Sequence, residues 1–440
     1  MNSFLSSLRD FIAHELEVKG APLRGLYLKF MSTCVSPEQQ EGLLHFLGIP
    51  GTRLPHSSTV DDALASVNYE DLNQMLLEMF NQMNTRKIFY NHAAKLLPNN
   101  TYYIGTDGYH LHTYDHPHAV DAHGNNTCPH CLPRRHNVGT DKERITWVHV
   151  VITFVFICDE FKIPLYVYPL KAQQVNTAQS DEKLKQECEL NGAHIVLPLI
   201  RKRFPRLHFT FLGDGLYANR PFIHLCNRLN FGYNIVREEN SLPTLRKKCD
   251  ELAKLNLYRS SYSHEEVEIV QNKKIERKAA WFNGADLGDD LSTNVLRFEE
   301  TWLGTEGKIL SRYKGEWLCS ERLKKTNCLR QARSGRMRWH HEDLHNSCKR
   351  RGFNIEHDMV RTHPGLLFTW KLMTFVAFFV FELFSLSTEA RNARGSRSLM
   401  KFARDMLQEL VYFTWAKIAS SVILKKKRVQ FRFYFGSSGP

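Results

Sequence analysis

The sequence predicts an α/β protein with a mixed sheet that is flanked by helices and followed by a β-rich insertion. From Tyr102 to Val236, strand-like runs of β-branched and aromatic residues alternate with helix-like segments. Near 241–345 this alternation gives way to short strand-like pieces among turn residues. Apolar residues at helical spacing occupy 1–95 and return after 345. Alternating strands and helices are typical of a sheet covered by helices, and clustered short strands are typical of a β-domain.

Residues 1–95 are predicted to form an N-terminal helical domain. Apolar residues recur at helical spacing from Phe4 to Ile12 and again from Leu72 to Phe80. A packing cap and a DNA-binding domain are both compatible with this pattern, so both hypotheses stay open.

The predicted sheet occupies 96–240, the first part of the core. Its first strand, Tyr102-Tyr103-Ile104, ends shortly before Asp107, and its fourth strand, 207–212, ends shortly before Asp214. Acids after the first and fourth strands fit a mixed sheet with helices on its faces. The other predicted elements are strands at 145–157, 163–168 and 233–236 and helices at 181–190 and 221–229.

Residues 241–345 are predicted to be the β-rich insertion, and Trp302 and Trp317 are its prominent aromatic residues. An indole ring can stack on an unpaired DNA base. A tryptophan in a small β-domain is more commonly a core residue, and that role is preferred here. The predicted strands are 267–270, 279–282, 295–298 and 309–313.

The helix after the insertion is predicted to run from Asn354 to His363, where Pro364-Gly365 ends it. Glu356 and His363 are seven residues apart, so they share one face of this helix. The helix belongs to 346–395, which is predicted to complete the core.

Two further helices are predicted, an apolar one at 366–386 and another at 398–418, followed within 396–440 by a basic tail. The uninterrupted apolar run from Leu372 to Phe381 is shorter than the roughly 20 residues that a membrane helix needs, so no membrane span is expected.

No export signal is visible. The ten cysteines are therefore expected to be reduced thiols in a cytoplasmic protein.

The composition favours a polyanionic partner. The chain has 440 residues, a net charge of +13 and a pI near 9.2, and such a charge attracts nucleic acid. Between Arg322 and Arg338 there are seven Lys or Arg residues and no acid, and Lys425–Arg428 forms a second basic run. Such runs are commonly solvated surface, but contact with DNA is preferred here. The candidate phosphate contacts of the first run are Lys324, Lys325, Arg330, Arg333, Arg336 and Arg338.

Three acidic residues, Asp107, Asp214 and Glu356, are the predicted catalytic groups. Carboxylate oxygens are the ligands that hard divalent cations prefer, and two such ions can clamp the attacking and leaving oxygens of a phosphoryl transfer. The Asp-Gly pairs at 107 and 214 are also typical of turns. Asp115 is an alternative to Asp107. Glu342 is an alternative to Glu356 and ranks second because its segment lacks an apolar face.

Around these acids the chain resembles the DDE transposases of bacterial insertion sequences. The matching segments are Tyr102–Gly108, Phe211–Ala218 and Arg351–Glu356. The chain is most similar to the large group whose ribonuclease-H-like catalytic domain is interrupted by a β-rich insertion.

The segment around the third acid departs from the pattern of that group, which reads Tyr, two residues, Arg, three residues, Glu, six residues, Lys. Near Glu356, Cys348 or Lys349 stands at the Tyr position. Gly352 stands at the Arg position and His363 at the Lys position. These departures leave open the alternative that the protein binds DNA without cutting it.

The resemblance implies a DNA transposase that cleaves phosphodiester bonds and transfers strands at insertion-sequence ends. It implies Mg²⁺ or Mn²⁺ bound by Asp107, Asp214 and Glu356, and a homodimer that binds double-stranded DNA at paired element ends and at the target. The alternatives are a transposase-derived DNA-binding protein without cleavage activity and a ribonuclease-H-like nuclease without strand transfer. No phosphate-cradling loop is visible, so no nucleotide cofactor is expected. The phosphate-binding residues would be Arg351, Arg361 and His363.

Cys128 and Cys131 are separated by two residues, a spacing that zinc sites use. A structural zinc ion would hold together the loop between the first and second predicted strands. It would not be the catalytic metal, because soft thiolates and magnesium chemistry do not share a site. The alternative is a polar loop with two unbonded thiols. The histidines that could complete the site are His123 and His136, which flank the pair, and then His118 and His130.

Overall fold

The computed structural model describes most residues between 65 and 402, in two compact units. The sheet unit is Met83–His345, and the helical unit combines Met1–Gln82 with Asn346–Pro440. The described residues are 65, 67–88, 101–158, 162–171, 181–239, 241–255, 261–271, 273–304, 307–350, 353, 355–356, 364–385, 391–392, 394–398 and 401–402.

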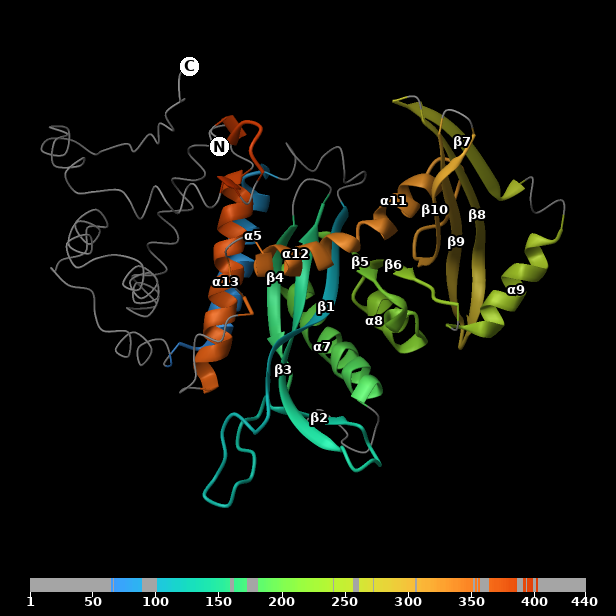
Figure 1. Cartoon of the computed structure of the whole chain (residues 1–440). Coiled ribbons are helices and arrows are strands. Elements are labelled where there is room, and N and C mark those ends of the chain that lie inside the picture. Colours follow the sequence, from blue (N-terminus) through green and yellow to red (C-terminus); the bar gives the residue numbers. More distant parts are fainter. Residues whose placement is uncertain are drawn as a thin grey trace, which may run out of the picture. The chain divides into compact units, whose positions relative to one another are not determined.

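One mixed sheet is the framework of the sheet unit (Figure 1). Its strands pair in the order β2-β3-β1-β5-β6-β10-β9-β8-β7, and β4 also pairs with β3. The strands are β1 (Thr101–Tyr114), β2 (Leu132–His136), β3 (Arg144–Ile157), β4 (Lys162–Pro169), β5 (His208–Gly213), β6 (Gly232–Val236), β7 (Ser263–Val270), β8 (Lys273–Gly288), β9 (Leu291–Leu303) and β10 (Ile309–Cys319). The helices are α5 (Tyr69–Thr85), α7 (Asp181–Arg203), the 3₁₀ helix η2 (Gly215–Tyr217), α8 (Arg220–Arg228), α9 (Pro243–Ala253), α11 (Cys328–Arg336), α12 (Trp339–Arg350) and α13 (Pro364–Ser385).

The strands from β1 to β6 have mixed directions. β3 is antiparallel to both β1 and β4, whereas β1, β5 and β6 are parallel to one another. β4 is buried along its whole length and β3 along most of it, as expected for apolar strands whose two faces are both covered. The predicted α/β fold with a mixed sheet flanked by helices is confirmed.

Helices cover both faces of this half of the sheet. On one face, α7 lies so close that a Cβ atom at Gly192 would stand 2.3 Å from Cδ1 of Ile152 in β3, and α8 packs on the same side through β5. On the other face, α12 runs across the strands (Figure 1), and His341 and His345 lie against Thr153 of β3.

Two strands extend the predicted pattern. The prediction placed β1 only at 102–104, but it continues through Thr106-Asp107-Gly108 to Tyr114 because these polar residues pair with β3 along its length. β2 is an additional strand that the sequence pattern does not predict. It pairs with the first half of β3, on the same edge that β4 occupies further along.

The segment predicted as a β-rich insertion contains an antiparallel meander of β7 to β10. It continues the main sheet, because β10 pairs with β6. Trp317 of β10 is 1% exposed and packs in a core with Trp281 and Phe298, so it is a core residue. Trp302 is partly buried, and its Nε1 donates a hydrogen bond to Glu300.

The helical unit contains α13 and most of α5. Leu366 and Trp370 of α13 pack with Val67, and the ring of Phe368 lies 6.3 Å from that of Tyr69 at the start of α5. The helical pattern predicted at Leu72–Phe80 is therefore α5. The rest of the predicted N-terminal domain, and most of the predicted C-terminal helix and tail, lie outside the described residues.

α13 begins at Pro364, where the sequence predicted the end of a helix. Proline suits the first turn of a helix, where a backbone N–H has no helical acceptor. Of the helix predicted at 354–363, only Ile355 and Glu356 are described, and they form a turn.

α13 corresponds to the apolar helix predicted at 366–386, and the two charged residues that interrupt its apolar sequence, Lys371 and Glu382, are both buried. By length and composition, its stretch Leu366–Leu383 is apolar enough to cross a membrane, and 72% of that stretch is buried in the structure. A mostly buried helix of this kind suits the core of a soluble protein.

Candidate active site

Asp107 and Asp214 lie on neighbouring parallel strands. Gly105 of β1 stands opposite Leu212 of β5, and each aspartate comes two residues later. The backbone remains extended at Asp214, with φ −81° and ψ −174°. Residues two apart on a strand point to the same face, and neighbouring strands are roughly 4.8 Å apart. The two carboxylates therefore emerge side by side on one face of the sheet.

This face is the one that α12 covers. Thr153 of β3 stands opposite Asp107, and directly opposed residues of an antiparallel pair point to the same face. The Thr153 hydroxyl lies 2.8 Å from Nε2 of His341 and 2.9 Å from Nε2 of His345. α12 therefore lies over the segment of β1 that carries Asp107.

α12 is fixed by contacts with three strands. Lys162 of β4 forms an ion pair with Asp343, and the ring of His345 lies 4.6 Å from that of Tyr109 on β1. His341 is fully buried. Burial, with the positive charges of neighbouring groups, lowers the pKa of His341 well below its ordinary value, so this imidazole is neutral near pH 7.

Asp214 takes part in a local turn, as its Asp-Gly pair predicts, whereas Asp107 lies within β1 and its Asp-Gly pair forms no turn. Oδ1 of Asp214 accepts a hydrogen bond of 3.0 Å from the N–H of Leu216 and caps η2. Oδ1 of Asp107 accepts one of 2.8 Å from the N–H of Gly108. A turn role and a metal role are compatible, because each carboxylate has further lone pairs.

Two residues that the sequence did not single out stand on the opposite face of β1. A Cβ atom at Gly108 would lie 2.3 Å from Oε1 of Glu189, a buried residue of α7, so a larger residue there would displace the Glu189 carboxylate. Tyr217 is also buried. Burial and then the negative charges of Glu189 and Asp214 raise the pKa of its hydroxyl well above the ordinary value, and Asp107 adds to this effect. The centre of the sheet unit is therefore a concentration of acidic groups.

Glu342 of α12 belongs to the sheet unit with both aspartates. Its Oε1 lies 3.0 Å from Nη2 of Arg338, one helical turn earlier, and 34% of its side chain is exposed. The neighbouring residues His341 and Asp343 are held against β3 and β4. The backbone that carries Glu342 is thus positioned on the face where the aspartates emerge.

Glu356 belongs to the helical unit. It lies in a turn, its side chain is 61% exposed, and its Oε1 lies 2.8 Å from Nζ of Lys349. Asp115, the alternative to Asp107, is exposed just beyond the end of β1.

A sequence signal for Glu342 is present in the spacing of its neighbours. The transposase pattern has Arg four residues before the glutamate and Lys seven residues after it, and Arg338 and Lys349 occupy these positions. Gly335 occupies the Tyr position. The apolar-face criterion ranks this segment second, and the buried face of α12 is built partly from His341 and His345.

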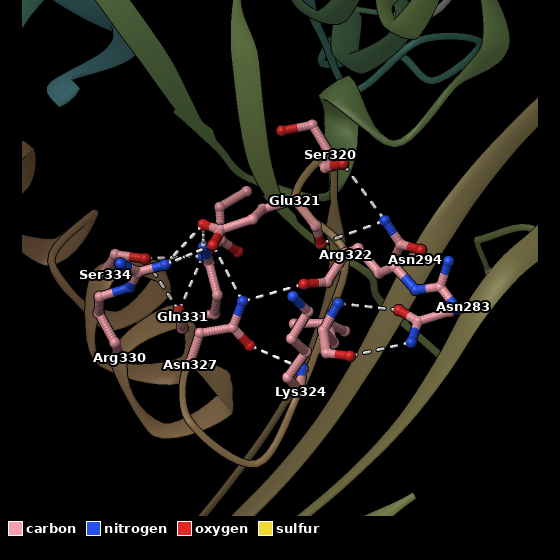
Figure 2. Close-up of polar contacts among 12 residues, drawn as sticks. Asn283, Asn294, Ser320, Glu321, Arg322, Lys324, Asn327, Arg330, Gln331 and Ser334 are labelled. Carbon is pink, nitrogen blue, oxygen red and sulfur yellow. Dashed lines mark hydrogen bonds and ion pairs between the residues drawn. The ribbon is translucent and has the colours of Figure 1, made fainter. Parts of the chain in front are cut away.

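The basic run from Arg322 to Arg338 is partly neutralised by acids. Arg330 contacts both carboxylate oxygens of Glu321, at 2.5 and 2.7 Å, in a polar network that shapes the β10–α11 connection (Figure 2). Arg336 lies 2.8 Å from Glu300. The exposed side chains of the run are Arg322, Lys324, Lys325 and Arg333. The other predicted phosphate contacts, Arg351, Arg361 and His363, and the basic tail lie outside the described residues.

Cys128 and Cys131 are buried free thiols that both contact Nε2 of His149. A hydrogen bond from Cys131 is the main cause that lowers the pKa of the Cys128 thiol. His123 is exposed in a turn, and Nε2 of His136 lies 2.8 Å from the hydroxyl of Thr146. The histidines grouped with Cys128 are His118 and His149.

A comparison of the sequence with models of known protein families finds no match, and no curated protein matches the chain.

Proposed function

We propose that this chain is a DNA transposase that cuts phosphodiester bonds and transfers strands at the ends of an insertion sequence. The observation that carries the proposal is the pair Asp107 and Asp214, side by side on parallel strands beneath a helix that carries an acidic residue. The strand order supports it. β4, β3 and β1 are antiparallel, β5 and β6 continue parallel to β1, and helices connect β4 to β5 and β5 to β6. This is the order of a ribonuclease-H-like core, which we propose for the sheet unit.

We assign the third carboxylate to Glu342 in preference to Glu356. Glu342 shares the sheet unit with the aspartates, on a helix that is tied to β3 and β4. It also has Arg338 and Lys349 at the spacing that the resemblance implies.

The three carboxylates suit Mg²⁺ or Mn²⁺. Their oxygens are hard donors, and soft sulfur ligands would favour other metals. A bound pair of such ions would supply charge neutralisation at the attacking and leaving oxygens of the scissile phosphate. The protein itself positions the carboxylates. β1 and β5 hold Asp107 and Asp214 in fixed register, and the Thr153–His341 contact holds the helix that carries Glu342.

The DNA is proposed to lie along the exposed basic residues of the β10–α11 connection and of α11. Lys324, Lys325 and Arg333 are exposed there, and the whole chain carries +13. Paired element ends imply a homodimer on DNA, and the N-terminal region is proposed to bind those ends.

A strand-transfer assay tests the function. The substrate is a duplex with the inverted repeats that flank the coding sequence, with a supercoiled target and Mg²⁺. Wild type should cut and join, whereas Asp107→Asn and Asp214→Asn should bind DNA normally and not cut, because phosphate contacts remain when the carboxylates are removed. Asp115→Asn, an exposed acid beyond β1, is the control and should behave as wild type.

The same assay separates the alternatives. Binding without cutting by wild type would make the chain a transposase-derived DNA-binding protein. Cutting without joining would make it a nuclease. Cutting by Asp214→Asn at the wild-type rate would overturn the site itself.

A further inference from the structure

A second constellation of side chains lies away from the three acids, where the loop between β1 and β2 returns to β3. Sγ of Cys131 is 3.1 Å from Nε2 of His149, and Sγ of Cys128 is 3.4 Å from the same nitrogen. Ligand atoms of His118, Cys128 and His149 all lie within 4.8 Å of one another. Three side chains with metal-binding atoms therefore form one group, and Cys131 contacts the same nitrogen of His149 that Cys128 contacts.

The cysteine side chains and His149 at this point are buried, although most of the loop around them is exposed. His149 is fully buried on β3, and both cysteines are at most 4% exposed, although 119–125 around them is mostly exposed. Both ring nitrogens of His118 are buried and meet no hydrogen-bond acceptor or donor of normal geometry among the described residues. A polar ring that is buried in this way carries a desolvation cost that a metal bond would offset.

We propose that Cys128, Cys131, His118 and His149 bind one structural Zn²⁺ ion. Zinc–sulfur bonds of about 2.3 Å and zinc–nitrogen bonds of about 2.0 Å put tetrahedral ligands roughly 3.5 Å apart. The observed separations of 3.1 and 3.4 Å are close to that requirement.

The charges also balance. Two thiolates and two neutral imidazoles neutralise a divalent ion, so the buried site carries no net charge. The thiol protons that remain before binding leave to solvent, because the thiolate is the metal ligand. His149 supplies a ligand from inside the sheet, so the ion would fasten the loop to β3.

The surrounding histidines do not compete for this point. Nδ1 of His130 lies 2.7 Å from the carbonyl oxygen of Leu170, which turns that ring toward the end of β4. His123 lies exposed in its turn, and His136 contacts Thr146. His123 and His136 serve as matched controls, because both lie in the same segment as the proposed ligands.

The test is zinc content per chain, measured by elemental analysis on full-length protein purified without chelator. Wild type should carry about one zinc ion. Cys128→Ser, Cys131→Ser, His118→Ala and His149→Ala should each lose zinc to a chelator concentration that leaves wild type loaded, whereas His123→Ala and His136→Ala should retain it. Equal loss in the control variants and in the ligand variants would overturn the ligand set.

A second measurement does not depend on how the variants fold. Reduced, metal-stripped wild type is titrated with Co²⁺, and a tetrahedral site with two thiolates should give visible d–d absorption and a thiolate-to-cobalt charge-transfer band. Wild type without zinc that also gives no such spectrum would overturn the proposal, as would a disulfide between the two cysteines in freshly isolated protein. The readout is independent of DNA cutting, so it can fail while the proposed function stands.

Discussion

The hydroxyl of Thr153 lies 2.8 Å from Nε2 of His341, although 188 residues separate them in the chain. The same oxygen lies 2.9 Å from Nε2 of His345 and 3.5 Å from the carbonyl oxygen of Asp107. A hydroxyl has one donor and two acceptor positions, so it can accept from both imidazoles and donate to the carbonyl. One threonine thus links the strand of the first acid to the helix of Glu342.

The first prediction concerns this link. Thr153→Val should destabilise the protein by about 2 kcal/mol, because two buried imidazole donors lose their acceptor. It should lower DNA cutting beyond what the unfolded fraction explains, since α12 is no longer fixed. Thr153→Ser keeps the hydroxyl and should restore most of both properties. Urea unfolding and cutting rates check this, and a fully active Thr153→Val would contradict it.

The second prediction distinguishes the two candidate glutamates. Glu342→Gln should abolish cutting while DNA binding is retained, and Glu356→Gln should cut at nearly the wild-type rate. Both changes are isosteric and remove one charge, so each variant controls for the other. The reverse pattern in a cleavage assay with Mg²⁺ would restore Glu356 as the third acid.

The third prediction concerns salt. Replacing Lys324, Lys325 and Arg333 by Ala should flatten the plot of log affinity against log salt by about 0.9 for each phosphate that the protein no longer neutralises. The same number of exposed lysines removed elsewhere, at Lys247, Lys254 and Lys273, should leave the slope nearly unchanged. Equal slopes for both triple variants would show that Lys324, Lys325 and Arg333 form only solvated surface.

The fourth prediction concerns Glu300 in the β-rich insertion. Burial opposes its ionisation, but hydrogen bonds from Trp302 and from two arginines, Arg277 and Arg336, outweigh burial and lower the pKa of Glu300. A carboxyl group whose pKa is lower in the folded than in the unfolded state stabilises the protein at pH values above the unfolded-state pKa of about 4.3. This stability is lost as the pH falls through the folded-state pKa.

Glu300→Gln should therefore cost about 2 kcal/mol at pH 7, and the difference from wild type should shrink towards pH 3. Unfolding by urea at several pH values measures this. Glu299→Gln, which removes a more exposed ion pair, is the control and should cost about 0.5 kcal/mol. A difference for Glu300→Gln that does not change with pH would contradict the pKa assignment.

The sequence predicts some parts of this molecule better than others, for physical reasons. The strands at 145–157 and 163–168 are predicted almost to their ends because buried β-branched runs have few alternative structures. β1 is predicted too short, since Thr106-Asp107-Gly108 is a turn-like sequence that only pairing with β3 keeps extended.

The site residues show the same limit. The sequence marks Asp107 and Asp214 as candidates because each comes shortly after an apolar run, although Asp107 lies within β1. His149 cannot, because it lies within an apolar strand run and its relation to Cys128 arises only from the fold. Glu342 ranks second in the sequence because its helix is anchored by polar contacts, which an apolar-face criterion does not detect.

The most direct test of the central claim, that Asp214 binds the catalytic metal, is DNA cutting by Asp214→Cys in Mg²⁺ and in Mn²⁺. Mn²⁺ accepts a sulfur ligand more readily than Mg²⁺ does. If Asp214 binds the metal, Asp214→Cys will be inactive in Mg²⁺ and partly active in Mn²⁺, while Asp214→Ser will be inactive in both and wild type will cut in both. Full activity of Asp214→Cys in Mg²⁺, or equal activity of the Cys and Ser variants in Mn²⁺, would contradict it.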